Sequence, residues 1–184
     1  MQLEKVIKGL KKGSNSALKE LYDTYGNLFF SITLRYSSST QEAEDYVQET
    51  FVHIFNNIDQ YQGNGSFEGW MKRILVNHCL SGIRKQNVLK HAEALEVDGT
   101  NPGEAVEASI IEALSVEELM ETIQQLPPGL RAVLNLYVFE GYKHQEIGKE
   151  LGITESASRS QLSKARVRLQ EFIQKKENAF TIHV

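Results

Sequence analysis

The sequence has few of the residues that build disulfide-linked, proline-rich or membrane-spanning proteins. Its 184 residues include one cysteine, three prolines and one tryptophan. The single Cys79 excludes an internal disulfide framework and suits a reducing compartment. No apolar run is long enough to cross a bilayer, and the charged start, MQLEKVIKGLKKG, is unlike a signal peptide. We therefore expect a cytoplasmic protein without direct membrane insertion.

Apolar residues instead recur at intervals of three and four, which predicts an all-α fold. The hydrophobic content of 41% is sufficient for a core. We expect helices near residues 1–13, 18–32, 40–58, 67–85 and 119–126. A further helix should begin at Pro128, since proline is tolerated in a first turn, and run to Gly141 with Leu130, Val133, Leu134, Tyr137 and Val138 buried.

Charge is distributed in blocks along the chain, although the net charge is only −4. All charges from residue 69 to 91 are positive, all from 92 to 121 are negative, and positive charge returns from 159 to 176. Two basic blocks separated by an acidic one suggest two nucleic-acid contacts. The acidic stretch contains DGTNPG, a linker signal. We expect two small helical domains, residues 1–90 and 115–184, joined by an acidic flexible linker at 91–114.

Residues 143–164 have the pattern of a helix-turn-helix. A short helix should run from Lys143 to Leu151, Gly152 should reverse the chain in a left-handed conformation, and Thr154 should cap a second helix. Such a pair places its second helix in the DNA major groove. That helix is rich in hydrogen-bonding and cationic side chains that suit phosphates and base edges. The candidate DNA-contact residues are Ser156, Ser158, Arg159, Ser160, Ser163 and Lys164. The alternative is an ordinary solvated surface helix.

The segment after residue 38 predicts the clearest helix. Ser39 and Glu42 have the spacing of a capping box, and apolar residues from Ala43 to Ile58 form one face. Asp45, Gln48, Glu49 and Val52 share the opposite face. Periodicity alone favours a solvated face, and an acidic docking surface for a basic partner is the alternative.

A polar, glycine-rich loop at residues 61–66 precedes a helix with a basic side. Backbone charge beside a pocket for an unstacked base is what binding a single strand requires. Phe67 and Trp70 flank the loop, and we expect Trp70 to be a core anchor. The candidate single-strand contacts are Asn64, Gly65, Ser66, Lys72, Arg73, Asn77, Arg84 and Lys85.

Taken together, the chain resembles the extracytoplasmic-function (ECF) group of bacterial sigma factors, from about residue 18 to 170. DYVQETF at 45–51 is similar to the family's DxxQExF helix of region 2, and FEGWMKRI at 67–74, with Asn77 and RK at 84–85, to its next segment. LPP at 126–128, FEGY at 139–142, EI at 146–147, LGI at 151–153 and KAR at 164–166 resemble region 4.

The resemblance implies roles for these residues. Asp45, Gln48 and Glu49, with Val52 on the same face, would dock on core RNA polymerase, which reverses the preference for a solvated face. The loop at 63–66 and Asn77 would capture an extruded base of the −10 element, and the basic residues of the following helix would hold the strand. Arg159, Ser160, Ser163 and Lys164 would face the −35 element. Promoter DNA is thus a partner, and an anti-sigma factor is a further partner common in the family, although the sequence carries no direct sign of one.

Two positions depart from the family pattern. Ser81 stands where an aspartate is frequent, and Ser158 stands where a buried valine is usual. We expect Ser158 either to turn its hydroxyl to a backbone carbonyl or to change the packing of its helix.

Two other classes of function are weaker. A conventional helix-turn-helix regulator would bind duplex DNA without polymerase and would leave the acidic face and the loop without a purpose. An enzyme would have to use His53, His78, Cys79, His91 or His144. His78 and Cys79 are adjacent and would point about 100° apart on a helix, and no HExxH or phosphate loop is present. We expect no catalysis, cofactor or metal.

Overall fold

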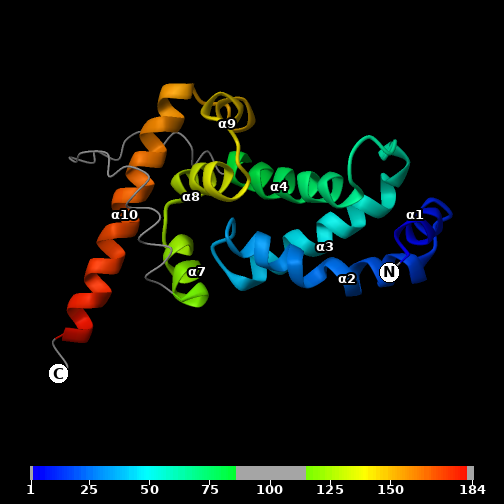
Figure 1. Cartoon of the computed structure of the whole chain (residues 1–184), viewed down its shortest axis with the longest axis horizontal. Helices are drawn as coiled ribbons and strands as arrows, with labels where there is room; N and C mark the ends of the chain where they lie inside the picture. The colour runs from blue at the N-terminus through cyan, green and yellow to red at the C-terminus, as the bar shows by residue number, and fades with distance from the viewer. Residues whose placement is uncertain (1, 86–114, 182–184) are drawn as a thin grey trace. The chain divides into compact units, whose positions relative to one another are not determined.

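The computed structural model describes residues 2–85 and 115–181, and within these ranges every regular element is helical (Figure 1). The expected all-α class is confirmed for these residues. The chain divides into two compact units, Met1–Ser81 and Gly82–Val184. The acidic linker at 91–114 lies outside the described residues. Within the described ranges, no helix has the length and apolar character that crossing a bilayer requires.

The first unit is built on a pair of long helices. It contains α1 (Leu3–Lys11), α2 (Asn15–Leu34), α3 (Thr40–Asn56), a short 3₁₀ helix η1 (Ile58–Gln60) and most of α4 (Phe67–Lys85). Helix α2 packs against α1 and α3, and α1 also packs against η1. Phe29 of α2 stacks on Phe51 of α3 with ring centroids 5.2 Å apart, and both rings are buried. This apolar contact aligns α3 so that its opposite face is exposed.

Serine hydroxyls cap the N-termini of α2 and α3 in this unit. The Ser14 Oγ accepts from the Ala17 amide at 3.4 Å, and the Ser39 Oγ accepts from the Glu42 amide at 3.2 Å. The carboxylate of Glu42 accepts from the amide of Ser38 at 2.6 Å and from its hydroxyl at 2.7 Å. The expected capping box is therefore shifted on one side, because the Glu42 side chain reaches Ser38 where Ser39 was predicted.

The second unit contains the last helices of the described chain. They are α7 (Val116–Gln124), α8 (Pro128–Leu134), a π-helical turn η2 (Asn135–Phe139), α9 (His144–Leu151) and α10 (Glu155–Thr181). Ser115 and Glu118 form a complete capping box at the start of α7. Helix α10 packs against α8, α9 and α7, so its buried side, including Leu162, Ala165 and Leu169, is the centre of the unit.

The helix predicted from residue 128 to Gly141 is interrupted by the π turn. The turn begins at Asn135, a fully buried residue whose Nδ2 donates to the Arg131 carbonyl at 2.9 Å. A π turn winds more residues into one turn and therefore rotates those that follow. Leu136 is fully buried as a result, whereas Tyr137 and Val138 are only partly buried. The prediction that both belong to the buried stripe was wrong.

The predicted turn between α9 and α10 is confirmed. Gly152 has φ 69° and ψ 33°, the left-handed conformation that favours glycine. The Ile153 amide then donates to the Gly148 carbonyl at 3.0 Å, and a Cβ on Gly148 would lie 2.8 Å from the Ile153 carbonyl oxygen. The Thr154 Oγ1 accepts from the Ala157 amide at 3.1 Å, as expected for a cap. Two glycines thus allow α9 and α10 to meet at a tight corner.

Candidate functional surfaces

The exposed face of α3 presents the four residues that sequence analysis placed together. Asp45, Gln48, Glu49 and Val52 are all exposed, and Val52 is 57% exposed. The Asp45 carboxylate accepts from Gln41 Nε2 at 3.3 Å, and Glu49 Oε2 lies 3.7 Å from His78 Nδ1 of α4. The face therefore combines an exposed aliphatic side chain with two carboxylates. This is the chemistry of a surface that binds an apolar and basic partner.

A groove along α2 continues this face, and sequence analysis missed it. It is lined by Tyr22, Asp23, Gly26, Asn27 and Phe30 of α2 and by Glu44, Val47 and Gln48 of α3. Tyr22 is 47% exposed although its ring lies 5.0 Å from that of Phe51. Gly26 supplies no side chain between the helices. The signal available in the sequence was Gly26 within the apolar stripe of α2, which indicates a close approach or a hollow.

The loop before α4 exposes the residues predicted to hold a base. Asn64, Gly65 and Ser66 are exposed, and Gly65 has φ 86°. The Tyr61 hydroxyl donates to the Gly65 carbonyl at 2.9 Å. The Ser66 Oγ accepts from the amide of Gly69 at 3.0 Å. The first bond closes the loop on itself, and the second connects its last residue to the first turn of α4.

An aromatic cluster supports this loop. The Phe67 ring lies 5.0 Å from that of Tyr61 and 5.6 Å from that of Trp70, and the Tyr61 and Trp70 rings are 5.5 Å apart. Phe67 is buried, whereas Tyr61 and Trp70 are only partly buried. The expectation that Trp70 is a core anchor therefore applies more closely to Phe67.

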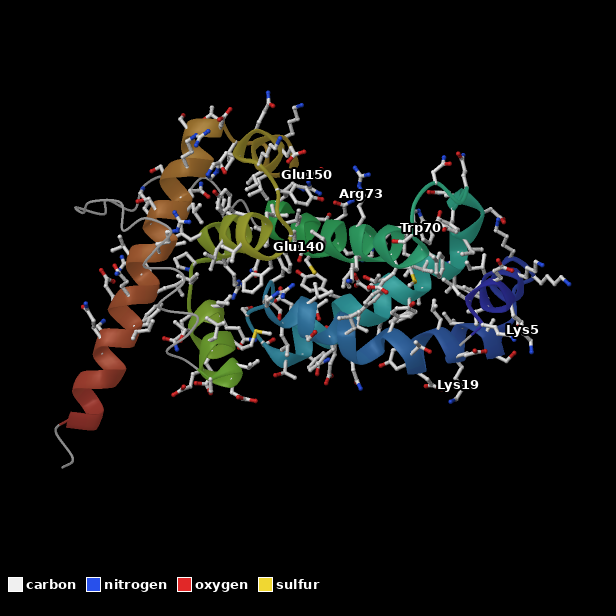
Figure 2. The ribbon with its side chains drawn as sticks, viewed as in Figure 1. Lys5, Lys19, Trp70, Arg73, Glu140 and Glu150 are labelled. Atoms are coloured by element: carbon white, nitrogen blue, oxygen red, sulfur yellow. The ribbon has the colours of Figure 1, made fainter. Side chains whose placement is uncertain are left out.

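Helix α4 carries one exposed polar stripe. Arg73, Asn77 and Arg84 are exposed and follow one another at intervals of four and seven residues, so they share a face. Figure 2 shows Arg73 projecting away from the helix. Lys72 is half-buried and forms an ion pair with Glu68 at 2.8 Å, which partly neutralises it. The side chain of Lys85 lies outside the part of the chain that the structure describes. The stripe suits a phosphate backbone at Arg73 and a base at Asn77. Arg84 is already engaged in part, because its Nη1 donates to the Glu150 carbonyl at 2.6 Å.

The start of α10 exposes part of the predicted recognition set. Ser156, Arg159 and Ser160 are exposed, whereas Ser163 and Lys164 are half-buried. The Arg159 guanidinium also pairs with Glu155 at 2.6 Å. Ser158 is the exception, because it is fully buried. Its inclusion among the DNA-contact residues was wrong, since it lies on the side of α10 that packs against α9.

The Ser158 hydroxyl is bonded to neither a backbone carbonyl nor solvent. It lies 2.9 Å from Nδ1 of His144, the first residue of α9. The His144 ring stacks on Tyr137 of η2 at 4.8 Å and 20°, and the Arg166 guanidinium lies 5.8 Å from the centre of the Tyr137 ring. Burial lowers the pKa of His144, and the cations Arg159 and Arg166 lower it further, whereas the carboxylate of Glu155 raises it. Both residues were candidates from the sequence for unrelated roles, and no sequence pattern indicated that they form a pair.

Among the described residues, the candidates for an enzymatic site do not form a cluster. Cys79 is buried, the His53 and His78 rings meet edge to face at 5.4 Å, and His144 contacts Ser158. Across the described ranges, no three His, Cys, Asp or Glu side chains are grouped as a metal site would need. His91 lies outside the described residues.

Comparisons with known proteins place both units. The family model of sigma-70 region 2 matches residues 21–88, and that of sigma-70 region 4 matches residues 116–169. The ECF RNA polymerase sigma factor SigW of Bacillus subtilis is 31% identical over 182 residues, covering 93% of this chain and 96% of that protein. The ECF RNA polymerase sigma factor SigE of Mycolicibacterium smegmatis is 31% identical over 163 residues, and the match covers 85% of this chain and 61% of that longer protein. In fold, the chain is similar to the sigma factor RpoE of Bartonella quintana, solved in complex with the anti-sigma factor NepR, with a TM-score of 0.52 and 20% identity over 85% of this chain and 96% of that one.

Proposed function

Because the chain belongs to the ECF group of the sigma-70 family, which directs bacterial RNA polymerase to specific promoters, we propose that its two units divide this task. The first unit docks on core polymerase and holds an opened −10 strand, and the second reads duplex −35 DNA. The observation that carries the proposal is that three separate surfaces, on α3, on the loop with α4, and on α10, each expose side chains with the chemistry of their own target.

Docking on polymerase is assigned to Asp45, Gln48, Glu49 and Val52. Their shared exposed face supports this, since two carboxylates steer toward a basic surface while Val52 supplies apolar contact. The groove between α2 and α3 reaches Gln48 and adds the exposed ring of Tyr22 to the same contact.

Promoter contacts are assigned to the remaining sets. Asn64, Gly65, Ser66 and Asn77 would hold an extruded −10 base, with Arg73, Arg84, Lys72 and Lys85 on the strand backbone. Ser156, Arg159, Ser160, Ser163 and Lys164 would contact the −35 duplex. The mechanism is recruitment and strand capture, with no bond made or broken by the protein, so no cofactor or metal is required. The protein would work where the polymerase does, in the cytoplasm.

Run-off transcription with core polymerase on genomic fragments tests the proposal. Transcripts should require the protein and should vanish with Asp45→Arg plus Glu49→Arg, which reverses the charge of the α3 face. Glu4→Arg plus Glu20→Arg is the matched control, because both residues are exposed in the same unit and the charge change is equal. Loss of transcription with both double variants would mean that net charge, rather than this face, governs docking.

Base capture has its own test. Asn77→Ala should weaken holoenzyme binding to a template whose −10 strand is already open by about 1–3 kcal/mol, the range for one base contact. Asn56→Ala, an exposed asparagine at the end of α3, should leave binding unchanged. Equal effects of the two substitutions would remove Asn77 from the contact.

Other functions are less consistent with these observations. A conventional helix-turn-helix regulator is not favoured, because the chain matches the family model of sigma-70 region 2 in addition to that of region 4. An anti-sigma factor remains a prediction from the family resemblance, and co-purification of the tagged protein from its own cells would test it.

A further inference from the structure

We propose that Ser158 and His144 act as a positioning pair, which fixes the angle of the recognition helix α10 against α9 and thereby sets −35 discrimination. The inference rests on the proposed function, because it concerns how the second unit presents Ser156, Arg159 and Ser160 to DNA. Neither residue touches DNA in this proposal. Ser158 is fully buried and His144 is 9% exposed, so both act through the helices that carry them.

The hydrogen bond joins α9 and α10 near the N-terminus of each helix. His144 begins α9 and Ser158 lies in the first turn of α10, so the 2.9 Å contact ties the starts of the two helices together through residues 14 positions apart in sequence. A small rotation of α10 would break this bond. The same rotation would move Arg159 and Ser160, the neighbours of Ser158, relative to a base edge.

The imidazole is itself held on its other side. Its ring stacks on Tyr137, which the π turn brings to this position, and Arg166 of α10 lies over the Tyr137 ring. The ring therefore has little freedom to follow the serine. A π turn within a helix is frequently found where such a local displacement serves function.

A buried hydroxyl needs a partner, whereas a buried valine does not. Removing one partner of a buried hydrogen bond leaves the other unsatisfied, but replacing both with apolar groups of similar shape can be nearly neutral. This difference separates the positioning pair from two independent packing residues. It also explains how a serine is accommodated where the family usually has a buried valine.

The charges around His144 make the pair sensitive to pH. Glu155, Arg159 and Arg166 of α10 act on the imidazole electrostatically, Tyr137 of η2 stacks on it, and Lys143 and Glu146 flank it on its own helix. Protonation would place a third cation beside two arginines in a buried position. The pKa of His144 is lowered from its ordinary value of 6.5, so the imidazole is neutral at and above pH 6.5, and the neutral pair is lost only as pH falls through that lowered pKa.

The experiment uses holoenzyme and a promoter found by run-off transcription. The readout is −35 discrimination, defined as transcription from the intact promoter divided by transcription from the same promoter with a scrambled −35 element. Four proteins are compared: wild type, Ser158→Val, His144→Phe and the double variant. His144→Phe keeps a ring for stacking on Tyr137. All assays run at a temperature where circular dichroism shows every variant folded.

We expect each single substitution to reduce discrimination at least about fivefold, corresponding to about 1 kcal/mol for an unsatisfied buried group. The double variant should recover most of the loss. Discrimination by wild type should also fall as pH is lowered through the depressed pKa of His144, whereas that of the double variant should stay flat. The ratio cancels pH effects on polymerase itself.

Two results would overturn the inference. Unchanged discrimination in both folded single variants would mean that the pair is only part of the core. Additive losses in the double variant would mean that the residues act independently. Absence of any transcript with wild type is a different result, because it contradicts the proposed function.

Discussion

The two units differ in what their cores are made of. Among the described residues, the buried polar side chains of the first unit are hydroxyls only, at Thr33, Ser37 and Thr50, and its centre is the stacked pair of Phe29 and Phe51. The second unit buries a wider range of polar side chains. They are two hydroxyls, two cations, two amides and an imidazole: Thr122, Ser158, Arg131, Arg166, Asn135, Gln161 and His144.

This difference shows two ways of supporting a proposed DNA-binding surface. In the first unit, aromatic packing supports a rigid base from which an exposed loop projects. In the second, polar partners determine the angle at which a helix is presented. Apolar packing tolerates changes of similar volume, whereas a polar core depends on each partner being satisfied. Substitutions should therefore damage the two units in different ways.

The largest effect is expected from a cavity in the first unit. Phe29→Ala should lower the free energy of unfolding by about 3–5 kcal/mol, because it deletes a fully buried ring. Leu28→Ala is the neighbouring control: Leu28 is 38% exposed and should lose far less. Chemical denaturation followed by circular dichroism measures both. Similar losses would show that this core is not packed around Phe29.

Substitutions of one glycine in each unit should have effects of intermediate size on stability, and these sharpen the comparison. Gly148→Ala in α9 should destabilise the protein by about 1–3 kcal/mol, since its Cβ would lie 2.8 Å from the backbone oxygen of Ile153. Gly26→Ala in α2 should be neutral or stabilising by up to about 1 kcal/mol, because its Cβ would meet only the Tyr22 ring at 3.5 Å. Thermal unfolding separates the two signs. A stable Gly148→Ala variant would mean that the corner between α9 and α10 can open.

The smallest effects are expected at the helix starts. Ser39→Ala in the first unit and Thr154→Ala in the second each remove a hydroxyl that accepts a hydrogen bond from a backbone amide. Each should lower the free energy of unfolding by about 1 kcal/mol. Only Thr154→Ala should also reduce −35 discrimination, because this cap begins the recognition helix. Equal effects on discrimination would contradict the division of tasks between the units.

Much of the helical framework follows from local patterns. Helix α4 begins at the predicted residue, Phe67, and is helical as far as Lys85, the last residue of that described range. The turn at Gly152 was predictable because the chain must reverse there and glycine allows the left-handed conformation. The π turn at Asn135 was not, since apolar spacing of three and four residues does not distinguish an α turn from a π turn.

The site was predictable to the extent that it depends on helix periodicity. The α3 face needed only the spacing of its four residues, and all four are exposed. Ser158 shows where this reasoning fails. Its small polar side chain and basic neighbours indicate a surface residue, whereas the family resemblance indicates a buried position. The packing of α10 against α9 shows that it faces inward to His144. A hydrogen bond between residues 14 positions apart leaves no periodic pattern in the sequence from which it could be predicted.

The bond between Ser158 and His144 also limits how this protein can be recombined. Exchanging recognition helices between related factors assumes that each helix is an independent module. Here the helix carries a serine whose partner belongs to the preceding helix, so a transplant that ends at the turn would separate the two. A chimera that retains promoter choice should therefore take residues from His144 onward, with α9 and α10 inherited as one cassette.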